Sequence, residues 1–65
     1  MNIKDNFVKI PLNGNTYDIN LEKLTMVLSY LENKTINIKN EQEISELLNK
    51  YSLYDEAFLS SINNI

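Results

Sequence analysis

The sequence contains neither histidine nor cysteine, and these two absences remove much of the chemistry that proteins perform. Without these residues the chain cannot build a Cys/His zinc site, a thiol nucleophile or a disulfide. Its serines have no imidazole that could activate them as nucleophiles. Acidic pairs such as Glu43 and Glu46 would hold a hard cation only weakly. We therefore expect a protein that is not an enzyme and that uses no metal or cofactor.

Arginine is also missing, because all six basic residues are lysines. The chain thus lacks the guanidinium fork that reads guanine in nucleic acids. Charge is uneven as well: residues 1–40 carry five lysines and four acids, whereas residues 41–65 carry one lysine and five acids. Phosphate binding requires clustered cations, so nucleic acid is not an expected partner. An acidic C-terminal third suits a partner protein with a basic surface.

Long apolar runs are absent too. The longest is far short of the roughly 20 residues that span a bilayer, so no membrane segment is expected. Nothing at the N-terminus resembles a signal peptide, which makes the cytoplasm the expected location. A length of 65 residues allows one small globular domain, residues 1–65. Residues 1–6 are polar and are expected to be loosely ordered.

The only glycine, Gly14, follows Asn13, and this pair predicts a type I′ turn because both residues tolerate positive φ angles. Folding the chain back there gives two strands, 7–12 and 16–19, with alternating apolar and polar residues. The expected register pairs Leu12 with Asn15, Pro11 with Thr16, Ile10 with Tyr17, Lys9 with Asp18 and Val8 with Ile19. Pro11 has no amide hydrogen, which indicates a strand that lies at a sheet edge or ends there.

The hairpin leads into a predicted helix over residues 21–32, with Asn20 as its N-cap. Its leucines and Val27 recur at the spacing of a helix that packs on a core. Met26 and Tyr30 fall on the opposite side, one turn apart. Either they form an exposed contact surface, or another element of the domain covers them.

Residues 35–39 alternate between apolar and polar side chains and predict a third strand. Asn40 and Glu43 predict a capping box at the start of a second helix. In that helix Glu46 and Lys50 are spaced to form a surface ion pair. A third helix is expected from about residue 55 to residue 63.

The expected fold class is therefore α+β with the order ββαβαα: a small three-stranded sheet, beginning with an N-terminal β-hairpin, packed against three helices. The expected contacts of the third helix are Ala57, Phe58, Leu59 and Ile62. The expected core comprises Val8, Ile10, Tyr17, Ile19, Leu21, Leu24, Val27, Leu28, Leu31, Ile36, Ile38, Ile44, Leu47, Leu48, Phe58 and Ile62.

Asn13-Gly14, Tyr17 and residues 24–28 resemble the hairpin-then-helix opening of the small β-grasp sulfur carriers, over about half of the chain. Residues 33–40 would then match the strand that follows in that family. The last third of the chain is predicted to be helical, where those carriers have a closing strand. Carrier function is therefore not expected.

Together these features favour a non-catalytic protein-binding module, such as an inhibitor that occupies a surface of a larger protein. A composition rich in Asn, Ile and Lys is typical of AT-rich bacterial and phage genomes, which suggests an inhibitor of phage or mobile-element type. Exposed aromatic residues beside charges are typical of interface hot spots. On this basis the expected partner-binding residues are Met26, Tyr30, Tyr54, Asp55 and Glu56.

Two other functions stay open at this point. The first is a homo-oligomeric assembly protein, for example a homodimer, whose interface hides Met26, Tyr30 and an aromatic cluster of Tyr51, Tyr54 and Phe58. The second is a small helix-turn-helix regulator built from residues 44–62. The second helix of that unit contains no lysine and begins with two acids, which would oppose docking on DNA.

Overall fold

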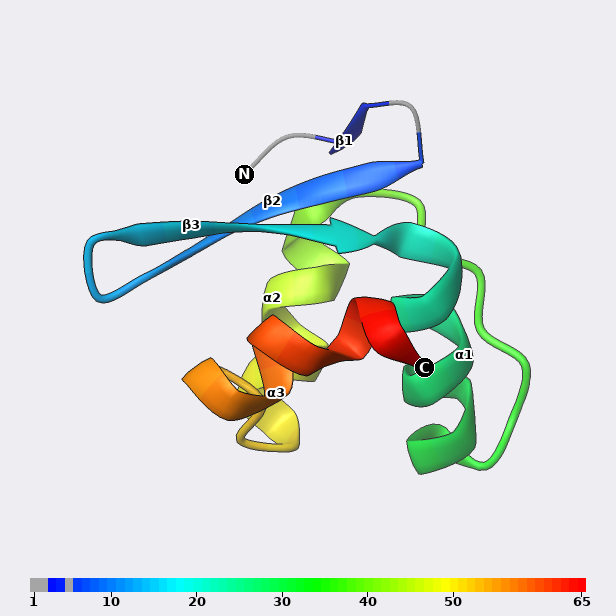
Figure 1. The fold of residues 1–65 in the computed structure, drawn as a ribbon. Helices are drawn as coiled ribbons and strands as arrows, with labels where there is room; N and C mark the ends of the chain where they lie inside the picture. Colours follow the sequence, from blue (N-terminus) through cyan, green and yellow to red (C-terminus); the bar gives the residue numbers. More distant parts are fainter. Residues whose placement is uncertain (1–2, 5) are drawn as a thin grey trace.

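The computed structural model describes residues 3–4 and 6–65, in which a β-hairpin lies over a layer of three helices (Figure 1). This arrangement confirms an α+β fold with a β-hairpin. No helix in the described part of the chain is long and apolar enough to cross a membrane. The elements in chain order are β1 (Ile3–Lys4), β2 (Phe7–Leu12), β3 (Asn15–Asn20), α1 (Leu21–Glu32), α2 (Glu41–Lys50), α3 (Glu56–Ser61) and the 3₁₀ turn η1 (Ile62–Asn64).

The β2–β3 hairpin forms in the expected register. Asn13 and Gly14 both have positive φ angles, 52° and 82°, as a type I′ turn requires. All five expected residue pairs are present, and β2 and β3 also pair Phe7 with Asn20. Pro11 lies beyond the reach of β1, which pairs only with Phe7 and Val8 in the described residues. Its missing amide hydrogen therefore removes no bond to that strand.

The expected third strand at residues 35–39 does not form, so the order ββαβαα is wrong, and so is the expected sheet in which this segment accompanied the hairpin. The segment between α1 and α2 belongs to no strand. It runs back along the helices from the end of α1 to the start of α2 (Figure 1). Ile36 and Ile38 are half-buried against the core, and the Ile36 N–H donates to the Ser29 hydroxyl at 3.2 Å. Packing on the helices thus replaces the expected pairing in the sheet.

The third strand of the sheet is β1, which lies beside β2 on the side away from β3. Ile3 pairs with Val8 and Lys4 with Phe7, so the strand order is β1-β2-β3. Residues 3 and 4, which were expected to be loosely ordered, thus pair with β2. For residues 1, 2 and 5 that expectation lies outside the described residues. A positive φ of 67° at Asn6 closes the turn into β2.

Helix α1 begins and ends at the expected residues, because a cap marks each end. The Asn20 side chain accepts a hydrogen bond from the Lys23 N–H at 3.0 Å. Asn33 adopts a left-handed conformation with φ of 59°, which lets the Lys34 N–H reach back to the Ser29 carbonyl at 3.1 Å. This is the Schellman arrangement, with asparagine in the position where glycine is commonest.

Helix α2 is capped by Asn40, whose side chain accepts from the Glu43 N–H at 3.0 Å. The expected capping box is shifted by one residue, since the Glu43 carboxylate bonds the N–H of Lys39 rather than that of Asn40. The third helix is shorter than expected, because α3 ends at Ser61 and continues as the 3₁₀ turn η1.

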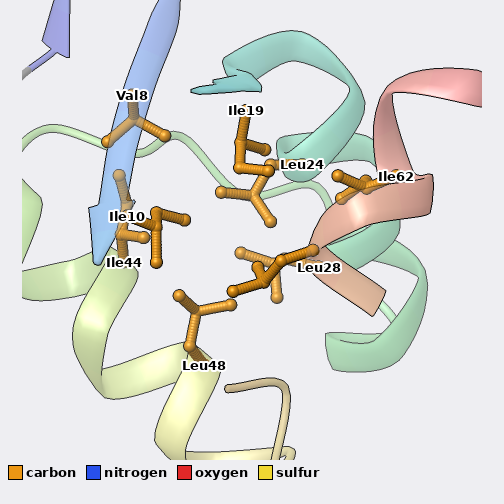
Figure 2. Packing of buried hydrophobic residues seen from close by; sticks show 9 residues of the cluster. Val8, Ile10, Ile19, Leu24, Leu28, Ile44, Leu48 and Ile62 are labelled. Carbon is orange, nitrogen blue, oxygen red and sulfur yellow. The ribbon is translucent and has the colours of Figure 1, made fainter. Parts of the chain in front are cut away.

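The core lies between the hairpin and the helices, where β2 and β3 point one face inward (Figure 2). Eight expected core residues are fully buried, and most of the others are half-buried. The expected burial of Leu31 is wrong, because this side chain in the last turn of α1 is 37% exposed. Leu59, an expected contact of the third helix, is only 2% exposed and belongs to the core. The fully buried residues are Val8, Ile10, Ile19, Leu24, Leu28, Ile44, Leu48, Leu59 and Ile62.

Candidate protein-binding surface

The outer face of α1 carries two large side chains that the described part of the chain leaves mostly exposed. Leu24 and Leu28 on the inner face are fully buried. One-half turn around the helix, Met26 is 54% exposed and Tyr30 is 84% exposed. Of the two alternatives left open by the sequence, the structure therefore places Met26 and Tyr30 at the surface. We call these two residues the α1 surface.

A shallow, open depression lies beside Tyr30, where α1 ends. The left-handed turn at Asn33 directs the chain back along the helix and forms one wall. The depression is open to solvent rather than enclosed, so its shape suits a protein surface better than a small molecule. Its lining residues are Met26, Ser29, Tyr30, Leu31, Asn33, Lys34 and Thr35.

Tyr54, another expected binding residue, is partly enclosed by the fold. It is half-buried and packs against the core. Its hydroxyl lies 3.1 Å from the Ser45 hydroxyl of α2, within hydrogen-bonding distance. Both the ring and the hydroxyl of Tyr54 thus have partners inside the protein.

Asp55 and Glu56 lie at the start of α3. The Asp55 carboxylate accepts a hydrogen bond from the Phe58 N–H at 2.9 Å, so Asp55 is the N-cap of this helix. Glu56 is exposed in the first turn, where an acid is favourable to the helix dipole. The cap at Asp55 and the helix dipole at Glu56 therefore give each of these two acids a role in α3 itself.

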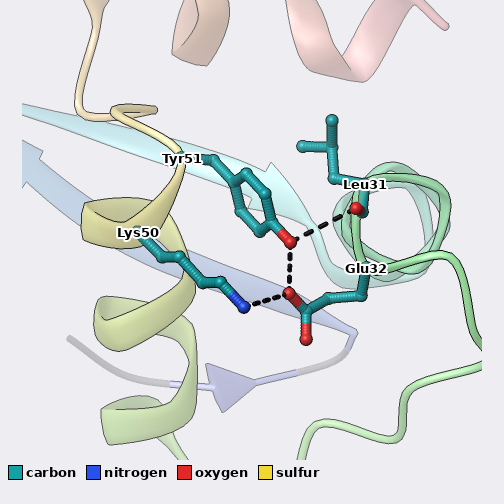
Figure 3. A network of polar contacts seen from close by, with 4 residues as sticks. All are labelled: Leu31, Glu32, Lys50 and Tyr51. Carbon is teal, nitrogen blue, oxygen red and sulfur yellow. Dashed lines mark hydrogen bonds and ion pairs between the residues drawn. The ribbon is translucent and has the colours of Figure 1, made fainter.

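A polar network that the sequence did not reveal joins the ends of α1 and α2 (Figure 3). The Glu32 carboxylate, 14% exposed, pairs with the Lys50 ammonium at 2.7 Å and accepts a hydrogen bond from the Tyr51 hydroxyl. That hydroxyl also lies 3.2 Å from the Leu31 carbonyl, so its single proton faces two acceptors. The expected pair of Glu46 with Lys50 is not the one that forms.

This network compensates an unfavourable placement. Glu32 is an acid in the last turn of α1, which contains no basic residue, so it faces the negative end of the helix dipole. An acid at this end of a helix is the signal in the sequence that favours a nearby cation from another element. The hydrogen bond from Lys50, and then that from Tyr51, lower the pKa of Glu32. The bond to Glu32 in turn raises the pKa of Lys50 and of Tyr51.

The lowered pKa of Glu32 predicts a loss of stability in acid. Its folded pKa lies below the unfolded value of about 4.3, so the ionised form stabilises the protein above that pH. The contribution should fade as pH falls below about 4.3 and through the folded pKa. We expect Glu32→Gln to lower the free energy of unfolding at pH 7, and the difference from wild type to shrink towards pH 3. Urea denaturation of the wild type and of Glu32→Gln between pH 3 and pH 7 measures the free energy of unfolding of each protein.

The partners of Glu32 supply the control for this prediction. In a Lys50→Met, Tyr51→Phe double variant, Glu32→Gln should change stability much less at pH 7, because the two groups that most favour the carboxylate are gone. If the wild type and Glu32→Gln differed in free energy of unfolding by the same amount at pH 3 and pH 7, the charge of Glu32 would not be what stabilises the contact between α1 and α2.

The five expected binding residues do not form one site. Met26 and Tyr30 lie on α1, whereas Tyr54, Asp55 and Glu56 lie at the start of α3, well apart in Figure 1. Only the first two are large apolar side chains left in solvent. Compared with known proteins, the chain matches no family model, no curated protein and no solved structure.

Proposed function

We propose that this protein is a non-catalytic binding module that acts in the cytoplasm by attaching its α1 surface to a larger protein. The observation that carries the proposal is the exposure of Tyr30, at 84%, one helical turn from the exposed Met26. Tyrosine and methionine are enriched at the cores of protein interfaces, where the ring supplies apolar area and the hydroxyl a hydrogen bond. Methionine adapts its shape to an irregular partner.

An inhibitor of phage or mobile-element type is one form that such a module takes. An inhibitor that acts by covering a surface of its target needs a rigid binding face but no catalytic residues. The α1 surface lies on a helix fixed by caps at both ends and by Leu24 and Leu28 on its inner face. A partner would therefore meet side chains whose backbone is already ordered, which lowers the entropy cost of binding.

The test is a comparison of three single variants. Tyr30→Ser and Met26→Ser remove the apolar contact, and Gln42→Ser changes an exposed side chain on α2 as the control. Proteins captured from a lysate of the source cells by immobilised wild type and variants are identified by mass spectrometry. Each candidate is then purified and titrated by calorimetry.

We expect one purified protein to bind the wild type and to lose at least about tenfold in affinity with Tyr30→Ser, since a hot-spot residue contributes about 2 kcal/mol or more. Gln42→Ser should leave its Kd within about twofold. Equal affinities for all variants would contradict the proposal, and so would the absence of any protein that distinguishes Tyr30→Ser from the wild type.

A further inference from the structure

One side of β3 has no neighbouring strand in the described part of the chain, since the strand order is β1-β2-β3. A two-residue turn makes Leu12 and Asn15 a hydrogen-bonded pair, and such pairs alternate with non-bonded ones along the hairpin. The backbone groups of Thr16, Asp18 and Asn20 therefore point away from β2. We call this side of the strand the β3 edge.

The Asn63 side chain occupies the C-terminal half of the β3 edge. Its Oδ1 accepts a hydrogen bond from the Asn20 N–H at 2.8 Å, and its Nδ2 donates to the Asp18 carbonyl at 2.7 Å. A residue of a parallel neighbouring strand would bond these same two groups through its own N–H and C=O. The carboxamide of Asn63 thus takes the place of one peptide unit of an added strand.

The protein holds Asn63 in this position from two sides. Asn63 belongs to the turn η1, which is anchored by Ile62, a residue only 1% exposed. The Lys23 ammonium of α1 donates to the Asn63 backbone carbonyl at 2.5 Å. The contact is therefore built into the fold and joins the end of the chain to the strand that precedes α1.

We propose that the Asn63 carboxamide closes the β3 edge against the β3 edge of a second copy of this chain. Exposed strand edges are templates for pairing with other chains, and proteins protect them with specific devices. Two copies of one edge pair antiparallel about a twofold axis, so each copy contributes the same groups. A register centred on Tyr17 places that half-buried ring opposite its counterpart, an aromatic cross-strand pair.

In the same register Thr16 of one copy lies opposite Asp18 of the other. The Thr16 N–H of one copy would donate to the Asp18 carbonyl of the other, twice by symmetry. That carbonyl is the acceptor that Asn63 already occupies. The Asn63 carboxamide therefore fills the place along β3 where the strand of a second copy would lie, and the intramolecular contact excludes the intermolecular one.

The first experiment is sedimentation velocity on the wild type, Asn63→Ala and Asn64→Ala over a roughly hundredfold concentration range. Asn63→Ala removes both bonds to the β3 edge, and Asn64→Ala changes the exposed neighbour in the same turn. We expect the wild type and Asn64→Ala to stay monomeric. Asn63→Ala should form dimers, with an association constant at least about tenfold above that of the wild type.

The second experiment locates the new contact. Thr16→Pro removes the amide hydrogen that would cross to the second copy, and because this amide points away from β2 it removes no hairpin bond. Adding Thr16→Pro to Asn63→Ala should return the protein to a monomer. Circular dichroism confirms that each variant is folded. If Asn63→Ala is not, Asn63→Asp replaces it, since the carboxylate still accepts from Asn20 but cannot donate to the Asp18 carbonyl.

A folded Asn63 variant that stays monomeric would overturn the proposal. So would a dimer that persists when Thr16→Pro is added. None of these outcomes depends on Met26 or Tyr30. The proposal for the β3 edge can therefore fail while the proposed binding by the α1 surface holds, and the reverse is also true.

Discussion

Replacing Leu28 with alanine is expected to lower the free energy of unfolding by about 2–5 kcal/mol. Leu28 is fully buried, and Figure 2 shows its side chain pointing into the space between the helices. Alanine would lose the packing of the removed atoms and leave a cavity, because the surrounding helices can close only part of the space. A 65-residue domain has a total stability of roughly 3–10 kcal/mol. The variant should therefore populate its unfolded state measurably at room temperature.

Urea denaturation followed by circular dichroism measures this loss. Met26→Ala is the matched control, since it shortens a large apolar side chain on the opposite face of the same helix. We expect its effect to stay within about 0.5 kcal/mol, as for most exposed positions. A loss below about 1 kcal/mol for Leu28→Ala would contradict the packing described for the core.

Replacing Tyr54 with alanine is expected to cost about 2 kcal/mol, roughly half of the loss for a fully buried ring. The ring packs against the core, and its hydroxyl has a partner in Ser45. Alanine removes the ring and leaves the Ser45 hydroxyl without that partner. Tyr54→Phe separates the two effects, because it keeps the ring and should cost only about 0.5–1.5 kcal/mol.

Tyr30→Ala is the contrast for Tyr54→Ala. Both variants delete the same side chain, but Tyr30 is 84% exposed. The free energy of unfolding of Tyr30→Ala should differ from that of the wild type by no more than about 0.5 kcal/mol. Thermal unfolding of the two variants side by side tests the difference. Equal losses would show that the surroundings of these two tyrosines are not as described.

The hairpin and α1 could be predicted from the sequence because their determinants are local. Asn13-Gly14 sets the turn, and the alternation of apolar residues agrees with the register that the turn imposes. Asn20 and Asn33 mark the two ends of α1 by their own side chain or backbone conformation. In each case two independent signals within a few residues indicate the same structure.

The segment 35–39 could not be predicted in the same way. Its alternation is that of a strand, and Ile36 and Ile38 are indeed half-buried between exposed neighbours. A strand also needs a second strand beside it, and that pairing depends on contacts far away in the sequence. Here α1 and α2 supply the apolar surface for both isoleucines, so the burial pattern is satisfied without a sheet.

The candidate site shows the same limit. Helical periodicity placed Met26 and Tyr30 opposite the core face of α1, but whether another element covered them was a non-local question. The partner of Lys50 was likewise non-local, since Glu32 lies on a different helix. Tyr54 was expected among the binding residues, and its half-buried position could not be predicted because an aromatic residue between two helices gives no periodic signal to show which way it points.

The bond between Asn63 and β3 also has a consequence for the time course of synthesis. It joins residues 43 and 45 positions apart, whereas the hairpin and α1 need only neighbours in sequence. At about 5–20 residues per second, a ribosome adds the residues between Asn20 and Asn63 in roughly 2–9 s. Hairpins form within microseconds. Asn63 is thus added seconds after the last residue of β3, so closure of the β3 edge is a late step that follows the completion of the strand itself.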